Sequence, residues 1–303
     1  MQYLTRRKFV RTSSVLLASS FMLPTFGLKK NLPPLAFSTL GCPDWDFEKI
    51  IDFAHQHNYT GIELRGIQRE MDLTKCNLFK KENLSSTLSI MQEKKLKFID
   101  LGSSANLHIG EVGERKKNLD EARRFIDLAN TIYCPYVRVF PNKIPDQNQK
   151  DRTIELIISG LLELGEFAKQ KNVTVLMETH GDLVHSDDIL RIMQSVNHSH
   201  TGLVWDVANM WTITKEPPVE VYQKLKKYIR HTHLKDANVV DGKITYRLLG
   251  EGEVPIFKAI DELVKDGYKG YYSFEWEKLW HPELADPEIA FAHFSSVMRK
   301  HFG

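Results

Sequence analysis

The sequence predicts that residues 31–303 of this 303-residue chain form a single (β/α)8 TIM barrel. Eight short apolar segments, each ending in a polar or glycine residue, alternate with amphipathic segments in units of roughly 25–40 residues. The alternative is a doubly wound open sheet, but no Gly-x-Gly-x-x-Gly motif follows the first strand. No linker or low-complexity stretch divides this part of the chain, so we expect one domain.

The eight expected strands are short apolar runs, as parallel strands buried on both faces should be. In chain order they are Leu35–Leu40, Tyr59–Leu64, Lys97–Leu101, Tyr136–Phe140, Val173–Glu178, Thr201–Asp206, Tyr228–Leu234 and Gly270–Glu275.

Amphipathic patterns predict the helices between these strands. The clearest are "WDFEKIIDFAHQH", "NLDEARRFIDLANTIY", "RTIELIISGLLELGEFAKQK" and "PIFKAIDELVKDG". In the third, apolar residues recur at helical spacing, at Ile154, Ile157, Ile158, Leu161, Leu162 and Leu164. We expect this stripe to pack against the barrel.

The first thirty residues resemble a twin-arginine export signal and are excluded from the expected fold. Arg6 and Arg7 are followed by Phe9 and by an apolar run from Val15 to Leu23. This run is too short for a permanent membrane anchor. A disordered basic tail is the alternative. We expect the protein to be exported, to the periplasm or beyond the cytoplasm in another way.

Charge and cysteine content exclude two other classes of protein. Six basic residues and no acidic residue lie in the first thirty positions, so the rest of the chain carries 2 − 6 = −4. Nucleic-acid binding is not expected, because phosphate backbones require a basic face. The three cysteines, Cys42, Cys76 and Cys134, have no metal-type spacing and are expected to be thiols.

Acidic and imidazole side chains end four consecutive expected strands. These residues are Glu178, Asp206, His233 and Glu275. Active sites of TIM barrels lie at the C-terminal ends of the strands, so the four side chains should meet there. Three carboxylates and one imidazole would repel or be poorly solvated unless a cation joined them. The set therefore predicts one divalent metal ion: Mn²⁺, Mg²⁺, Co²⁺ or Zn²⁺.

Several neighbouring residues have two possible roles. Alternation places His231 on the same strand face as His233, where it can donate to a backbone group or a carboxylate. Asp236 can cap the next turn. Glu277 can pair with a surface lysine or reach a substrate. Trp276, like Trp280, can stack on a sugar ring or pack in the core.

The motifs "METHGD", "WDVANMW", "HTHLKD", "LGEGEVP" and "SFEWE" resemble those of the xylose isomerase-like barrels. That superfamily includes sugar isomerases and epimerases of the tagatose 3-epimerase type, inosose dehydratases and endonuclease IV. The resemblance extends from about Leu35 to His301 and implies metal ligation by the same four residues, Glu178, Asp206, His233 and Glu275. It places His180, Lys235 and Arg138 on the substrate side. Asn209 stands where many members have histidine, which changes a substrate contact or a second metal site.

This ligand set predicts proton transfer beside a carbonyl group of a small sugar. A divalent cation can stabilise the enediolate formed when the adjacent C–H bond loses its proton. Glu178 and Glu275 are the expected pair of bases, one on each side of the sugar. Return of the proton gives epimerisation or isomerisation, and loss of a β-substituent gives elimination, as from a 3-keto-glycoside.

Export favours an unphosphorylated sugar or keto sugar as the partner. We expect a metal-dependent isomerase or epimerase, with a lyase or a non-catalytic sugar-binding barrel as alternatives, and a homo-oligomer is possible.

Overall fold

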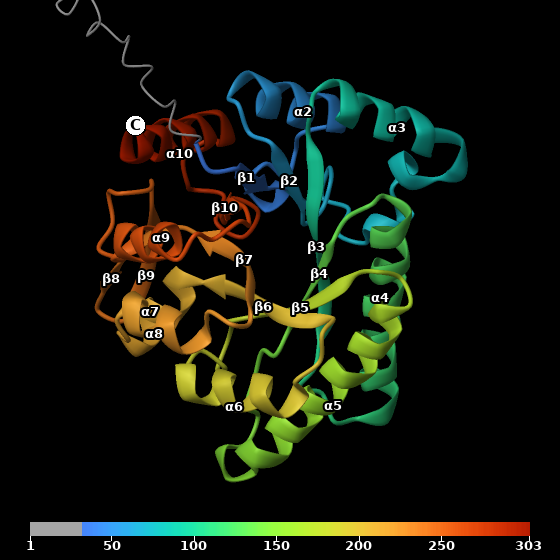
Figure 1. Cartoon of the computed structure of the whole chain (residues 1–303), viewed down its shortest axis with the longest axis vertical. Helices are drawn as coiled ribbons and strands as arrows, with labels where there is room; N and C mark the ends of the chain where they lie inside the picture. The colour runs from blue at the N-terminus through green and yellow to red at the C-terminus, as the bar shows by residue number, and fades with distance from the viewer. Residues whose placement is uncertain (1–31) are drawn as a thin grey trace, which may run out of the picture. The chain divides into compact units, whose positions relative to one another are not determined.

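The structure is a computed structural model that describes residues 32–303, so the proposed export signal lies outside the described residues. Eight parallel strands close into a barrel in the spatial order β1-β10-β7-β6-β5-β4-β3-β2 (Figure 1). Their bounds are β1 Leu35–Ser38, β2 Gly61–Leu64, β3 Lys97–Asn106, β4 Tyr136–Phe140, β5 Thr174–Glu178, β6 Thr201–Asp206, β7 Ile229–Leu234 and β10 Tyr272–Phe274. The predicted TIM barrel is confirmed.

Helices follow the strands and form the outer layer of the barrel (Figure 1). The α-helices are α2 Phe47–Gln56, α3 Lys81–Glu93, α4 Val112–Thr131, α5 Lys150–Lys169, α6 Ser186–Val196, α7 Val207–Thr214, α8 Pro218–Leu225, α9 Ile256–Lys265 and α10 Pro287–Phe302. Short 3-10 turns occupy Thr39–Gly41, Leu73–Lys75, Asn77–Phe79 and Gln147–Gln149.

The apolar stripe of α5 is narrower than its sequence predicts. Ile154, Ile157, Leu161 and Leu164 are buried. Ile158 is half-buried and Leu162 is exposed. The buried residues recur at intervals of three and four, which keeps them on one line along the helix. Ile158 and Leu162 lie beside that line.

An antiparallel hairpin follows β7 and was not predicted. It comprises β8 Asp236–Val240 and β9 Lys243–Arg247, paired from Asp236 with Arg247 to Val240 with Lys243. Asp241 and Gly242 form its turn with φ angles of 50° and 75°. An Asp-Gly pair favours such a turn because both central residues need positive φ. That pair is the sequence signal for the hairpin.

Asp236 begins the hairpin and fixes the loop that follows it. Its carboxylate accepts hydrogen bonds from the backbone N–H groups of Ala237, Gly250, Gly252 and Val254, at 2.9–3.2 Å. A Cβ atom at Gly252 would lie 2.2 Å from Oδ1 of Asp236. The motif "LGEGEVP" therefore supplies a backbone that can approach this carboxylate.

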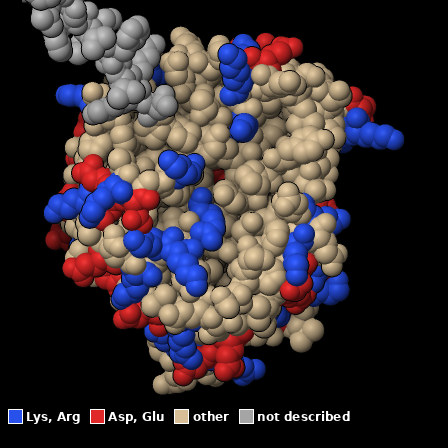
Figure 2. All heavy atoms as spheres, viewed as in Figure 1, with Lys and Arg blue, Asp and Glu red and all other residues tan. Residues whose placement is uncertain are grey.

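The surface carries charges of both signs. Figure 2 shows acidic and basic side chains next to one another around the edge of the visible face, with a group of basic side chains nearer its centre. The three cysteines are free thiols, as expected, and Cys42 and Cys134 are buried. No helix within residues 32–303 has the length and apolar character needed to cross a membrane.

Candidate metal centre and substrate cavity

Four buried side chains converge at the C-terminal end of the barrel. Glu178 and Asp206 are the last residues of β5 and β6, His233 lies in β7, and Glu275 follows β10. One ligand atom from each of the four lies within 4.8 Å of the others. Neighbouring parallel strands bring them together, since Asp206 is in register with His233 and His233 with Ser273.

The imidazole of His233 lies among the three carboxylates. Its Nδ1 atom is 3.3 Å from Glu275 Oε1, 3.5 Å from Glu178 Oε1 and 4.0 Å from Asp206 Oδ2. This Nδ1 is buried without a hydrogen-bond partner among the described residues, while Glu178 Oε2 lies 3.1 Å from Arg138 and Asp206 Oδ2 lies 2.8 Å from Lys235. Buried polar atoms normally have partners. An unpartnered nitrogen among three carboxylates fits the ligand set of a divalent cation.

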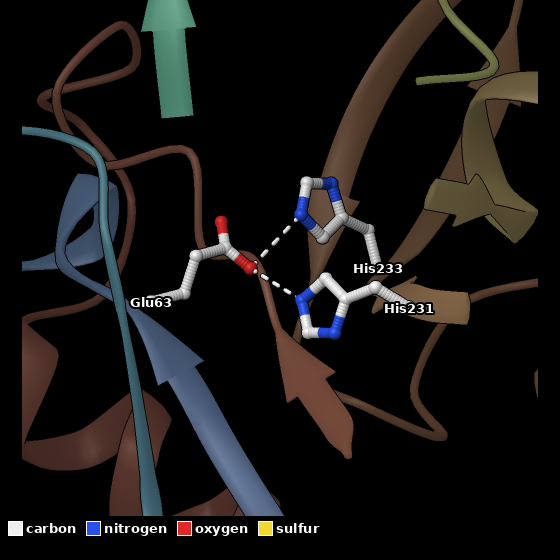
Figure 3. Close-up of side chains that lie close together, drawn as sticks. All are labelled: Glu63, His231 and His233. Atoms are coloured by element: carbon white, nitrogen blue, oxygen red, sulfur yellow. Dashed lines mark hydrogen bonds and ion pairs between the residues drawn. The ribbon is translucent and has the colours of Figure 1, made fainter. Parts of the chain in front are cut away.

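Glu63, at the third position of β2, connects β7 to the opposite side of the barrel (Figure 3). Its Oε2 lies 2.8 Å from His231 Nε2, 3.0 Å from His233 Nε2 and 3.1 Å from the Ser273 hydroxyl. Burial alone would raise the pKa of Glu63, but His233 and His231 lower it overall. The anionic oxygen therefore accepts from both rings.

These contacts determine which nitrogen of His233 is available for a metal. When the ring is neutral and donates Nε2–H to Glu63, its lone pair lies on Nδ1, which points to the three carboxylates. Glu63, His231 and His233 also lie close enough to hold an ion themselves. Their contacts have hydrogen-bond lengths, so we interpret them as a positioning network.

The pKa shifts show that negative charge is crowded in this site. Burial raises the pKa of Asp206 to about 7; Lys235 opposes this shift, while Glu275 and Glu178 add to it. Burial would lower the pKa of His233, but Glu275, Glu63 and Glu178 raise it well above its usual value. Both shifts reflect carboxylates gathered in a buried space. A divalent cation would add positive charge among them.

Lys235 is held by three carboxylates beside the four candidate ligands. Its ammonium lies 2.8 Å from Asp206, 2.5 Å from Glu275 and 2.6 Å from Glu277, and the side chain is 1% exposed. Glu277 pairs with this buried lysine and not with a surface lysine, and it also lines the cavity described below. Burial would lower the pKa of Lys235, but Asp206, Glu275 and Glu277 raise it well above its usual value, so Lys235 is a cation that orients Glu275.

Arg138 and His180, two other residues expected to contact the substrate, are held by neighbouring side chains and backbone groups. Arg138 Nε lies 3.1 Å from Glu178 Oε2, its Nη1 donates to the Ser103 carbonyl at 2.9 Å, and its guanidinium lies over the Phe140 ring. His180 Nδ1 lies 2.8 Å from the side-chain oxygen of Asn142.

Asn142, which also contacts Asn106, was not singled out from the sequence. It follows β4 in the segment "FPN", directly after an expected strand.

Asn209 lies beside the candidate ligands, in the first turn of α7. Its backbone N–H donates to Asp206 Oδ1 at 2.8 Å, so Asp206 caps this helix through Oδ1, while its Oδ2 faces Lys235. Its side-chain amide is 3.4 Å from Glu178 Oε1. The amide of Asn209 thus donates to Glu178 at this position.

A cavity of about 210 Å³ opens beside these groups, a volume below the range of ~300–1,000 Å³ that holds drug-sized ligands. Its walls are formed by Leu40, Arg65, Arg138, Phe140, Glu178, His180, Glu275, Glu277 and Trp280. Trp276 is not among them. It is 1% exposed, stacks on Phe274 and donates Nε1–H to the Ala285 carbonyl. Of the two tryptophans considered for stacking, Trp280 is the one at the cavity.

The sequence profile of the xylose isomerase-like TIM barrel family matches residues 51–294. The chain belongs to this family. The chain is 24% identical to a 3-dehydroshikimate dehydratase of Bacillus anthracis, over 76% of this chain and 85% of the relative. A fructoselysine 3-epimerase of Shigella flexneri is 21% identical over 57% of this chain and 64% of its own length.

Solved structures of this family share the fold. The IOLI protein, crystallised with a bound zinc atom, superimposes with a TM-score of 0.72 at 18% identity, over 89% of this chain and 96% of that protein. The resemblance expected from the motifs is thus confirmed, and members of the family include both epimerases and dehydratases.

Proposed function

We propose that this protein is a divalent-metal-dependent isomerase or epimerase that acts on a small unphosphorylated sugar or keto sugar through an enediolate. The observation that carries the proposal is the buried group of Glu178, Asp206, His233 and Glu275 beside a cavity. A divalent ion bound there would polarise the carbonyl and an adjacent hydroxyl of the substrate. Its identity among Mn²⁺, Mg²⁺, Co²⁺ and Zn²⁺ is left to elemental analysis.

Glu178 and Glu275 are suited to move the proton. They reach the cavity from β5 and from the end of β10, which are separated in the barrel by β6 and β7. The pKa of each is lowered overall: burial opposes the shift, while Arg138 and His233 act on Glu178, and His233 and Lys235 on Glu275. Both are therefore carboxylates at neutral pH and accept a proton from carbon.

The surrounding cations complete this arrangement. Arg138 contacts Oε2 of Glu178, and Lys235 contacts Oε2 of Glu275. Oε1 of each glutamate faces Nδ1 of His233. His180, held by Asn142, lies at the cavity wall and is placed to contact a substrate hydroxyl. Transfer between two bases on two sides of the sugar inverts a carbon centre or moves the carbonyl.

The test uses Glu275→Gln, which keeps an oxygen ligand and removes basicity. We expect metal content close to that of the wild type and turnover lower by ~10² or more. Metal-loaded protein is incubated with free sugars and keto sugars in D₂O, and NMR records deuterium on carbon. Glu283→Gln, on the surface, is the control and should exchange at the wild-type rate. Full exchange by Glu275→Gln, or none by the wild type with any sugar, would contradict the proposal.

A dehydratase or other lyase is the second candidate. The Bacillus anthracis relative, which this chain matches over 85% of the relative's length, is a dehydratase. Elimination uses the same first proton transfer and then requires an acid for the departing oxygen. We assign that role to Lys235, which contacts Glu275 and Glu277. The same NMR spectra distinguish the two, since elimination creates a new double bond, its hydrate or a released aglycone. A sugar-binding barrel without turnover would show neither signal.

A further inference from the structure

Arg65 is a buried cation at the cavity without an ionic partner. It follows β2, is 6% exposed and lines the cavity together with Glu178, His180 and Glu275. Its guanidinium donates from Nη2 to the Ser104 hydroxyl at 3.1 Å and from Nη1 to the Gly102 carbonyl at 3.3 Å. No carboxylate within residues 32–303 lies within 4.0 Å of it, whereas Arg138 is paired with Glu178.

The barrel provides room for this second guanidinium. A Cβ atom at Gly102 in β3 would lie 2.6 Å from Cδ of Arg65 and 2.8 Å from Nη2 of Arg138. The side chains of Arg65 and Arg138 therefore occupy the space that a side chain at position 102 would fill. Burial, and next the charge of Arg138, lower the pKa of Arg65 to about 9. At neutral pH the group remains a cation in an unfavourable environment.

We propose that Arg65 binds a carboxylate of the substrate, so that the preferred substrate is a sugar acid. A guanidinium has five N–H donors in a planar fork, and two of those on Arg65 are used by the described residues. The fork matches a carboxylate, which would pair the buried charge and fill the remaining donors. The inference rests on the proposed function, because it assigns the substrate class of the same site.

Binding measurements with matched sugars test this assignment without turnover. Mn²⁺-loaded protein is titrated calorimetrically with D-glucuronate, D-glucose and D-glucose 6-phosphate. We expect D-glucuronate to bind at least ~10-fold more tightly than D-glucose, in keeping with a charge-assisted bidentate contact. The preference should be lost in Arg65→Met, reduced in Arg65→Lys and unchanged in Arg69→Met. Arg69 pairs with Asp44 on the surface and serves as the matched control.

Three outcomes would overturn the inference. The first is that D-glucuronate binds no more tightly than D-glucose at any accessible concentration. The second is that the preference for D-glucuronate persists in Arg65→Met, as it would if the metal alone held the carboxylate. A stronger preference for D-glucose 6-phosphate would also overturn it, in favour of a phosphate subsite. Arg65→Lys keeps the charge and controls for misfolding. Deuterium exchange without carboxylate preference would refute only this inference, while preference without exchange would refute only the isomerase.

Discussion

At the scale of single residues, Glu63 links the candidate metal centre to the far side of the barrel. One of its oxygens contacts His231, His233 and Ser273, and all four residues are buried. A metal-binding histidine needs its other nitrogen held by an acceptor, which fixes the tautomer and the ring orientation. The same oxygen also supports His231, which confirms the expectation that this histidine donates to a carboxylate.

Substitution of Glu63 tests that role. Glu63→Gln replaces the carboxylate with a neutral amide. The anionic oxygen that accepts from both His231 and His233 is then lost. We expect the affinity for Mn²⁺ to fall by ~10–100-fold, measured by competition with a fluorescent chelator. Glu82→Gln, on the exposed side of α3, should leave the affinity unchanged. Wild-type affinity in a folded Glu63→Gln protein would show that the network does not position the ligand.

At the scale of elements, the hairpin β8–β9 and the loop after it form the connection between the barrel strand β7 and helix α9. Asp236 stands at their junction, is 1% exposed and accepts four backbone hydrogen bonds. Tyr246 of β9 lies 5.8 Å from the Lys235 ammonium. The hairpin is thus connected to the site through the two residues that end "HTHLKD".

Loss of the Asp236 carboxylate should destabilise this region. Asp236→Ala leaves buried N–H groups without acceptors, so we expect the free energy of unfolding to fall by ~2 kcal/mol or more. Urea denaturation followed by circular dichroism measures this change. Asp151→Ala, which removes an exposed ion pair with Arg191, should cost less than ~1 kcal/mol. Equal effects of the two substitutions would show that Asp236 does not anchor the loop.

At the scale of the whole molecule, the charge distribution separates the first thirty residues from the rest. Six basic residues and no acid occur there, whereas residues 31–303 carry a net −4, from +2 − 6. We propose that these thirty residues direct export of the folded protein, which favours an unphosphorylated substrate. The described residues, 32–303, contain the complete barrel.

Replacement of both arginines tests export. Arg6→Lys combined with Arg7→Lys keeps the charge and removes the guanidinium pair that a twin-arginine pathway reads. We expect the double variant to remain in the cytoplasm, as shown by fractionation and immunoblotting of cells that express each form. Lys29→Arg combined with Lys30→Arg is the matched control and should be exported. An unchanged extracytoplasmic fraction of the double variant would exclude this signal.

Local pattern alone determined the barrel and the strand ends. Apolar segments alternate with amphipathic ones, and the C-terminal ends of parallel strands meet at one end of a barrel, so Glu178, Asp206, His233 and Glu275 were predicted to converge. The structure brings them within 4.8 Å. The Asp241-Gly242 pair is likewise a local signal for the hairpin turn.

Only the tertiary structure decided which side chains are partners across the barrel. Glu63 and His231 are 168 residues apart, and no local pattern pairs them. The sequence likewise offered Trp276 and Trp280 equally, but packing against Phe274 places Trp276 in the core. Closure of the barrel pairs Arg138 with Glu178 and leaves Arg65, at the same cavity, without a carboxylate within 4.0 Å among residues 32–303. Such choices depend on strand register and on the space between side chains, which are properties of the folded chain.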